Sequence, residues 1–421
     1  MKIDKLTRNP YLLFSPFLLL FVVFVLIYHT DVLKGDAGGY IYFANNLLHG
    51  FYSPPAPDIN LWWGPGYPII LMPFKFLNLP LICITLLNAI FQYLSIVFLF
   101  KALIKFVKFQ KAFLFSIIWA FCYSSYSNMA SIATESFTLF LISIFVYSLV
   151  KTFVNDSRKY LFLAGFILGY LALTKVIFGY VILSILVGCV LLWAIKRNNN
   201  NYRRSLLIML VALLTTIPYL FYTYNLTSKL FYWGNSGGMT LYWMSSPYIN
   251  EYGAWDNETF DANLIDLELA SSNELLRINH QTDIDEITKY TGVQKDDAYK
   301  RIALKNIKTH PIKYFKNIMA NISRMLFGFP GNFTYQRPLL KIWYFAVLYT
   351  LMVFCFLLSI INWNKLSYCI RFIFVFTFIY LGGTSLLGAG NRQFVIIVPT
   401  LLFWIAYIID KYIILKTNQS K

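Results

Sequence analysis

Long apolar runs recur along this chain, and each is about as long as a membrane's hydrocarbon core is thick. They have roughly 18–20 residues and fall at 11–29, 79–100, 112–128, 134–150, 160–175, 177–195, 205–224, 339–361, 370–388 and 393–410. Backbone polar groups in lipid must be hydrogen-bonded within their own segment, so each run is predicted to be a helix. Only 13% of the residues are charged, against about 25% in a soluble domain. We therefore predict an all-α integral membrane protein with about ten transmembrane helices.

Lysine and arginine residues predict how these helices are oriented. They cluster in every second connection, at Lys2–Arg8, Lys101–Lys111, Lys151–Lys159, Lys196–Arg204, Lys365–Arg371 and Lys411–Lys421. The short connections between these clusters are nearly free of both residues. Because basic connections stay in the cytoplasm, we expect a multi-pass protein of the plasma (inner) membrane with both termini cytoplasmic. The same pattern accounts for the net charge of +17 without a nucleic-acid partner.

Two long connections, 29–80 and 225–338, are predicted to lie on the external side. The second holds twelve of the nineteen acidic residues, all between Glu251 and Asp297. We predict that it is a small α-rich soluble segment with helices over 260–280 and 296–328. The chain would then consist of an N-terminal transmembrane module at 1–224 with seven helices, the external segment at 225–338, and a C-terminal three-helix segment at 339–421.

Isolated charged residues gather at the external ends of the predicted helices. They are the carboxylates Asp31, Asp36, Asp58 and Glu135 and the cations Lys175 and Arg392. Ionisable residues at or near membrane depth are costly, which makes them functional candidates by default. A transporter is expected to place such charges near the midplane and often contains an internal repeat. The sequence shows neither feature.

Each of these residues also has a structural interpretation. Asp36 precedes a short amphipathic helix over 40–50 that we expect to lie in the membrane interface, so its carboxylate could cap that helix. Glu135 begins the fourth predicted transmembrane helix, where a carboxylate favours the helix dipole. Lys175 and Arg392 could extend to the interface. The scarcity of external cations instead favours anion binding by these two residues.

These residues, in this order, resemble the GT-C superfamily of polyprenyl-phosphate-sugar glycosyltransferases, in particular the bacterial relatives of protein O-mannosyltransferases and lipid A aminoarabinose transferases. The resemblance covers most of the chain. It rests on Asp36 with Tyr40 four residues later, Pro65-Gly66-Tyr67-Pro68, Glu135, Lys175, Gly237–Tyr242, His310-Pro311 with the helix after it, and Arg392-Gln393-Phe394. This chain departs from the pattern at Ala37, where a second acidic residue is frequent. It also departs at Trp63-Gly64, where aminoarabinose transferases carry a lysine.

The resemblance implies a GT-C-like fold and an inverting hexosyl- or pentosyltransferase. Such an enzyme moves a sugar from a polyprenyl-phosphate donor to a hydroxyl of a glycan, lipid or protein acceptor at the external face. Asp36 would be the general base, and the 1–224 module would be catalytic. The substrate-binding residues would be Tyr40, Tyr67, Glu135, Lys175 and Arg392, with Arg324 and Arg337 as further phosphate ligands.

No cofactor or metal ion is expected. The Asp283-Ile284-Asp285 triplet is interpreted as solvated surface, and the five cysteines lie in apolar runs without CxxC spacing. Two alternatives stay open: a multi-pass transporter or flippase, and a lipid-linked glycan polymerase of cell-surface polysaccharide synthesis.

Overall fold

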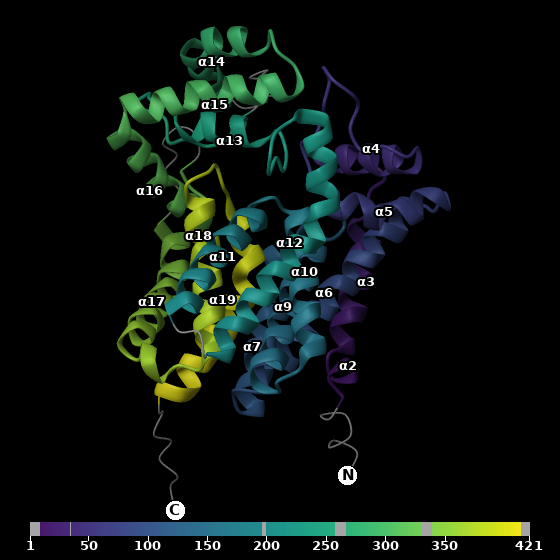
Figure 1. The fold of residues 1–421 in the computed structure, drawn as a ribbon, viewed down its shortest axis with the longest axis vertical. Helices are drawn as coiled ribbons and strands as arrows, with labels where there is room; N and C mark the ends of the chain where they lie inside the picture. Colours follow the sequence, from purple (N-terminus) through teal and green to yellow (C-terminus); the bar gives the residue numbers. More distant parts are fainter. Residues whose placement is uncertain (1–8, 34, 196–198, 257–266, 331–338, 414–421) are drawn as a thin grey trace, which may run out of the picture.

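The computed structural model describes residues 9–33, 35–195, 199–256, 267–330 and 339–413, and in these ranges the chain forms helices and no strand. Most of the helices run along the longest axis as a bundle, and a smaller group covers one end of it (Figure 1). The elements are α2 (Pro10–Leu13), α3 (Ser15–Tyr28), α4 (Ala37–Leu48), α5 (Gly66–Phe76), α6 (Leu81–Leu103), α7 (Phe109–Ala120), α8 (Tyr123–Tyr126), α9 (Glu135–Val154), α10 (Arg158–Thr174), α11 (Ile177–Ile195), α12 (Asn200–Thr227), α13 (Gly237–Met244), α14 (Leu267–Ile287), α15 (Gly292–Thr309), α16 (Pro311–Phe327), α17 (Leu339–Ile361), η1 (Trp363–Lys365), α18 (Tyr368–Ser385) and α19 (Asn391–Tyr412).

Six of these helices are long and apolar enough to cross a membrane: α6, α9, α11, α12, α18 and α19. Shorter apolar helices are α3, α7 and the Tyr349–Ile361 part of α17. The chain is therefore a multi-pass membrane protein. Every predicted run coincides with a helix, although α7 ends at Ala120 rather than at 128. The total of ten spans stays a prediction.

Residues from connections that were assigned to the same side of the membrane contact one another. Lys111, just inside α7, pairs with Asp410 near the end of α19 at 2.9 Å. Arg204 of α12 pairs with Asp156, which lies between α9 and α10. In Figure 1 the start of α2 and the end of α19 lie at the same end of the bundle as α7, opposite α13–α16. The bundle thus has one basic end and one end that carries the helices of the long connections.

The long connections fold differently from the prediction in two places. The helix expected over 296–328 is two helices, α15 and α16, because Pro311 lacks the N–H that an uninterrupted helix needs there. The Pro65-Gly66-Tyr67-Pro68 stretch, whose prolines and glycines are typical of a bend, instead begins a helix, α5, at Gly66. The helix predicted over 40–50 is present as α4.

Close backbone contacts fix the first long connection against the bundle. A Cβ atom at Gly64 would lie 2.1 Å from the carbonyl oxygen of Leu173, at the end of α10. A Cβ atom at Gly39 of α4 would lie 2.3 Å from the Trp63 ring. Only glycine permits such an approach. As a result, α4, the Trp63-Gly64 segment and the end of α10 form one packed unit.

Candidate functional site

Side chains from five helices meet at the end of the bundle next to α4. They are Asp36 at the N-cap of α4, Tyr40 in α4, Tyr67 in α5, Glu135 as the first residue of α9, Lys175 at the C-cap of α10, and Arg392 in the first turn of α19. Each of the six interacts electrostatically with at least one of the others. The structure therefore brings these six residues together, while their roles stay predictions. Of the other carboxylates that the sequence singled out, Asp31 contacts His29 at 3.2 Å and Asp58 lines a separate cavity.

Arg392 joins the two carboxylates of the cluster. Its Nε donates to Glu135 Oε1 at 2.6 Å, and its Nη2 donates to Asp36 Oδ2 at 3.2 Å. A guanidinium is suited to this because its N–H groups point in fixed directions within one plane. The Asp36 side chain makes no capping hydrogen bond to α4 although it occupies the N-cap position. Contact with Arg392, and not capping, is what orients this carboxylate.

Glu135 and Lys175 have hydrogen-bonding capacity that the described residues do not use. Glu135 is 4% exposed, and its Oε2 has no hydrogen-bond partner in the described ranges. The Lys175 ammonium likewise makes no hydrogen bond to any described residue, although it lies in the electrostatic field of Glu135. Buried polar atoms are rarely left without partners, which marks Glu135, with Lys175 beside it, as a candidate for contact with a ligand.

Two tyrosines form the wall behind the charged cluster. The Tyr40 ring lies 5.5 Å from Trp63 and 5.2 Å from Tyr67, measured between ring centroids. Both tyrosines are buried. The Tyr67 hydroxyl lies near Asn88 and Ala133 without reaching hydrogen-bond geometry. These rings hold α4 and α5 together and close one side of the site.

Arg324 lies outside this cluster and hydrogen-bonds to other residues of the chain. Its Nε donates to the carbonyl of Pro330 at 2.8 Å, and its Nη2 donates to the carbonyl of Tyr252 at 2.7 Å. Its Nη1 donates to Asn321 Oδ1 at 3.0 Å. The expected phosphate-binding role for Arg324 therefore does not fit, because backbone and amide oxygens already occupy its donors. Arg337 lies outside the described residues.

Sequence reasoning missed the residues that position Arg392. Asn321 of α16 is fully buried, and its Nδ2 donates to the carbonyl of Ser385 at 3.0 Å while its Oδ1 accepts from the Ala389 N–H at 3.0 Å. Gln393 closes the start of α19 by accepting from the Gly390 N–H at 2.8 Å. A usable signal was present, since Asn317 and Asn321 lie four residues apart on one face of an otherwise amphipathic helix.

A second buried polar group lies in the external segment and was not predicted. His280 Nε2 lies 2.9 Å from Glu251 Oε2, and its Nδ1 lies 2.6 Å from the Tyr242 hydroxyl, which donates to Asp283 at 3.1 Å. Asn279 donates to the other Glu251 oxygen at 2.6 Å. The side chains of this buried group hydrogen-bond to one another, so the group stabilises the packing of α13 and α14. In the described ranges no cluster of side chains is arranged to hold a metal ion.

Comparison with known proteins places the chain far from characterised ones. No family model matches the sequence, and no curated protein matches it. Among solved structures, it is similar to the crystal structure of ArnT from Cupriavidus metallidurans bound to undecaprenyl phosphate, with 11% sequence identity and a TM-score of 0.42 over 94% of this chain and 77% of that chain. A likeness at that score carries no argument about activity, so the site must be judged on its own geometry.

Proposed function

We propose that this protein is a membrane glycosyltransferase. It transfers a sugar from a polyprenyl-phosphate-linked donor to an acceptor hydroxyl at the external face, with Asp36 as the general base. The observation that carries the proposal is the contact of Asp36 with Arg392, beside Glu135 and Lys175, in place of a capping hydrogen bond. The order of these residues along the chain, which resembles the GT-C superfamily, supports the same reading.

Asp36 has one carboxylate oxygen held and one available. Oδ2 accepts from Arg392, whereas Oδ1 accepts no hydrogen bond from any described residue. The acceptor oxygen would attack C1 of the sugar as its proton passes to Oδ1, and the bond from C1 to the phosphate oxygen would break with inversion. Proton transfer to a positioned base contributes typically about 10²–10⁴-fold to such a rate.

The two cations would stabilise the departing phosphate. Arg392 uses two of its N–H groups on carboxylates, its side chain is 48% exposed, and its remaining donors are free to meet a ligand. The Lys175 ammonium has all its donors available among the described residues. Positive groups fixed in a poorly hydrated site need little reorganisation as negative charge develops. Glu135 would hold Arg392 in place and keep the cluster near neutrality before the donor binds.

The proposal is tested with purified full-length protein in lipid nanodiscs and a panel of undecaprenyl-phosphate sugars. Release of undecaprenyl phosphate is measured for the wild type, Asp36→Asn and Glu135→Gln. Asp36→Asn should bind the donor normally and turn it over roughly 10²-fold more slowly or worse, because an amide cannot accept the proton. Wild-type turnover by Asp36→Asn would remove Asp36 from the role of base. A flippase would move the lipid across the bilayer without cleaving it, so translocation without phosphate release would refute the proposal.

A further inference from the structure

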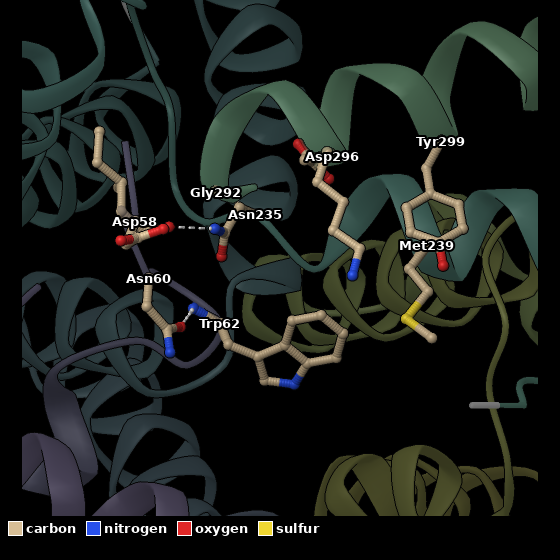
Figure 2. A pocket seen from close by; sticks show the side chains of 10 residues that line it. Asp58, Asn60, Trp62, Asn235, Met239, Gly292, Asp296 and Tyr299 are labelled. Atoms are coloured by element: carbon tan, nitrogen blue, oxygen red, sulfur yellow. Dashed lines mark hydrogen bonds between the residues drawn. The ribbon is translucent and has the colours of Figure 1, made fainter. Parts of the chain in front are cut away.

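A cavity of about 270 Å³ lies where the first long connection meets the external segment. Figure 2 shows that its walls come from separate stretches of the chain: Asp58, Asn60 and Trp62, with Asn235 beside them, and Met239, Asp296 and Tyr299 on the other side. This volume falls just below the roughly 300–1,000 Å³ of pockets for drug-sized ligands. The occupant must therefore be about the size of a single sugar ring.

The cavity presents one aromatic face among polar groups. The Trp62 indole is half-buried, and its N–H has no hydrogen-bond partner in the part of the chain that the structure describes. The Asn60 side chain uses its oxygen to accept from the Trp62 backbone N–H at 3.1 Å, which leaves its two N–H donors unused by described residues. The Asp58 carboxylate is exposed and makes no contact of this kind with the described chain. An aromatic plane beside amide and carboxylate groups matches a pyranose, which has an apolar C–H face and a rim of hydroxyls.

The charges around the cavity are balanced and do not form a cationic site of the kind that a phosphate-bearing ligand needs. Lys295 is the one cation among the residues that line it, and Asp58 and Asp296 are both acidic. Asp296 is itself buried, pairs with Lys300 at 2.5 Å, and accepts from the Gly238 N–H at 2.6 Å and from the Tyr232 hydroxyl at 3.1 Å. Because Lys295 and Lys300 match the two acidic side chains, the cavity has no excess of either charge and fits an uncharged ligand.

Hydrogen bonds hold the walls in place before any ligand binds. Asn235 Oδ1 accepts from the Leu61 N–H at 3.0 Å, and its Nδ2 donates to the carbonyl of Ile59 at 2.9 Å. A Cβ atom at Gly292 would lie 2.5 Å from the carbonyl oxygen of Pro57, so the start of α15 is pressed directly against the loop. A preformed cavity of this kind binds without the entropic cost of ordering its walls.

The cavity and the Arg392 cluster share a wall. The rings of Trp62 and Trp63 lie 6.2 Å apart, and Trp63 packs on Tyr40 with ring centroids 5.5 Å apart. Tyr40 is in the first turn of α4, which follows Asp36. A sugar chain that places one ring against Trp62 would therefore extend along this wall toward the proposed base.

We propose that this cavity binds an uncharged pyranose unit of a glycan, stacked on Trp62 and hydrogen-bonded by Asn60 and Asp58. That this glycan is the acceptor rests on the proposed function. The acceptor class would then be a carbohydrate whose recognised unit is a sugar ring set back from the reacting hydroxyl.

Direct binding provides the test. Full-length protein is mixed with the methyl glycosides of glucose, galactose, mannose and N-acetylglucosamine, and contacts are detected by saturation-transfer NMR. At least one glycoside should bind the wild type. Trp62→Ala should weaken that binding roughly tenfold, and Trp62→Phe should restore most of it, since an aromatic contact contributes about 0.5–1.5 kcal/mol. Trp255→Ala, at a half-exposed tryptophan outside the cavity, should bind like the wild type.

The outcomes separate this proposal from the proposed function. If the wild type binds none of the glycosides, or if Trp62→Ala binds as well as the wild type, the cavity proposal is overturned. Binding that depends on Trp62 in a protein that cleaves no undecaprenyl-phosphate sugar would support the cavity and refute the glycosyltransferase. With an active enzyme, Trp62→Ala should raise the KM for the glycan acceptor by a larger factor than it lowers kcat, and Trp62→Phe should restore most of the KM.

Discussion

Arg392 hydrogen-bonds to two carboxylates at once, and the two carboxylates differ in how strongly they depend on Arg392 to compensate their charge. The Asp36 side chain is 36% exposed and can exchange Arg392 for water, whereas the Glu135 side chain is 6% exposed. A hydrogen bond to a charged group contributes about 1.5–3 kcal/mol. Removing one partner of a buried pair costs more, because the other charge is left without compensation. Stability and activity should therefore respond differently to substitutions at this residue.

For Arg392 we expect Arg392→Ala to lower thermal stability and to abolish most donor turnover. The double variant Arg392→Ala with Glu135→Gln should recover stability, since Glu135 is then no longer a buried carboxylate without its arginine, but not turnover. Arg392→Lys keeps the charge but cannot bridge both carboxylates in one plane, so it should fold well and turn over slowly. Thermal unfolding and release of lipid phosphate are measured side by side. Full activity in the double variant would show that Arg392 has only a structural role.

Substitution of Lys175 should affect thermal stability in the opposite direction to substitution of Arg392. The Lys175 side chain is half-buried, and its ammonium makes no hydrogen bond to a described residue, which is unfavourable for a charge partly removed from water. Lys175→Met should therefore leave the melting temperature unchanged or raise it, while donor turnover falls. If Lys175→Met lowers stability and turnover together, the loss of activity says nothing about phosphate binding. Normal turnover would assign the leaving group to another residue.

At the scale of elements, sequence patterns predicted where the helices lie more accurately than where helices are interrupted. Apolar runs predicted α6, α9 and α19 because a span in lipid leaves the backbone no alternative. Pro311 indicates a break between α15 and α16. The amphipathic pattern continues on both sides of Pro311, however, and a single helix over 296–328 was predicted. The first residues of α5, Gly66-Tyr67-Pro68, carry turn signals, so a helix there could not be foreseen. Tertiary packing of Gly64 and Gly66 on the end of α10 decides its start.

The 225–338 segment packs a buried ion network beside the apolar core that α13, α14 and α15 share. Burial alone raises the pKa of Glu251, but the hydrogen bond and charge of His280, with hydrogen bonds from Ser246 and Asn279, hold it below its usual value. A lowered folded-state pKa gives stability that is complete above the unfolded-state value of about 4.3 and is lost as the pH falls through the folded-state value. The α13–α14 contact should therefore loosen in acid before the bundle does.

We expect Glu251→Gln to destabilise this contact by roughly 1.5–3 kcal/mol at neutral pH and to remove its loss of stability in acid. Hydrogen exchange of the α14 backbone, followed by mass spectrometry between pH 3 and 7, measures both effects. Glu274→Gln is the matched control, because Glu274 lies on α14 itself, has a side chain that is 55% exposed and, among the described residues, pairs with Arg277. Equal protection of α14 in Glu251→Gln and wild type would contradict the proposed stabilising role.

At the scale of the whole molecule, the alternation of basic connections sorted the chain into two ends that the structure keeps apart. The sequence could place Asp36, Glu135, Lys175 and Arg392 at the same end. It could not show which of them touch, because contacts between residues 356 positions apart depend on how the helices pack. The same limit applied to Asn321, whose partners lie in the connection between α18 and α19.

Orientation in the membrane is tested by labelling single cysteines in a variant without the five native ones. Thr282→Cys, on the exposed face of α14, should react with a membrane-impermeant maleimide on intact cells. Gln110→Cys, exposed at the start of α7, should react only after permeabilisation. The reverse pattern would place the Arg392 cluster in the cytoplasm and exclude an external reaction.

The contact between Asp36 and Arg392 also has a consequence for biosynthesis. Asp36 and Glu135 are synthesised and inserted into the membrane before Arg392 is synthesised. Both carboxylates therefore enter the membrane without their arginine partner. The cluster closes only when α19 joins the bundle. A nascent chain that stalls earlier would hold Asp36 and Glu135 with Lys175 as the one cation of the cluster, and it would lack the arginine that the proposed reaction requires.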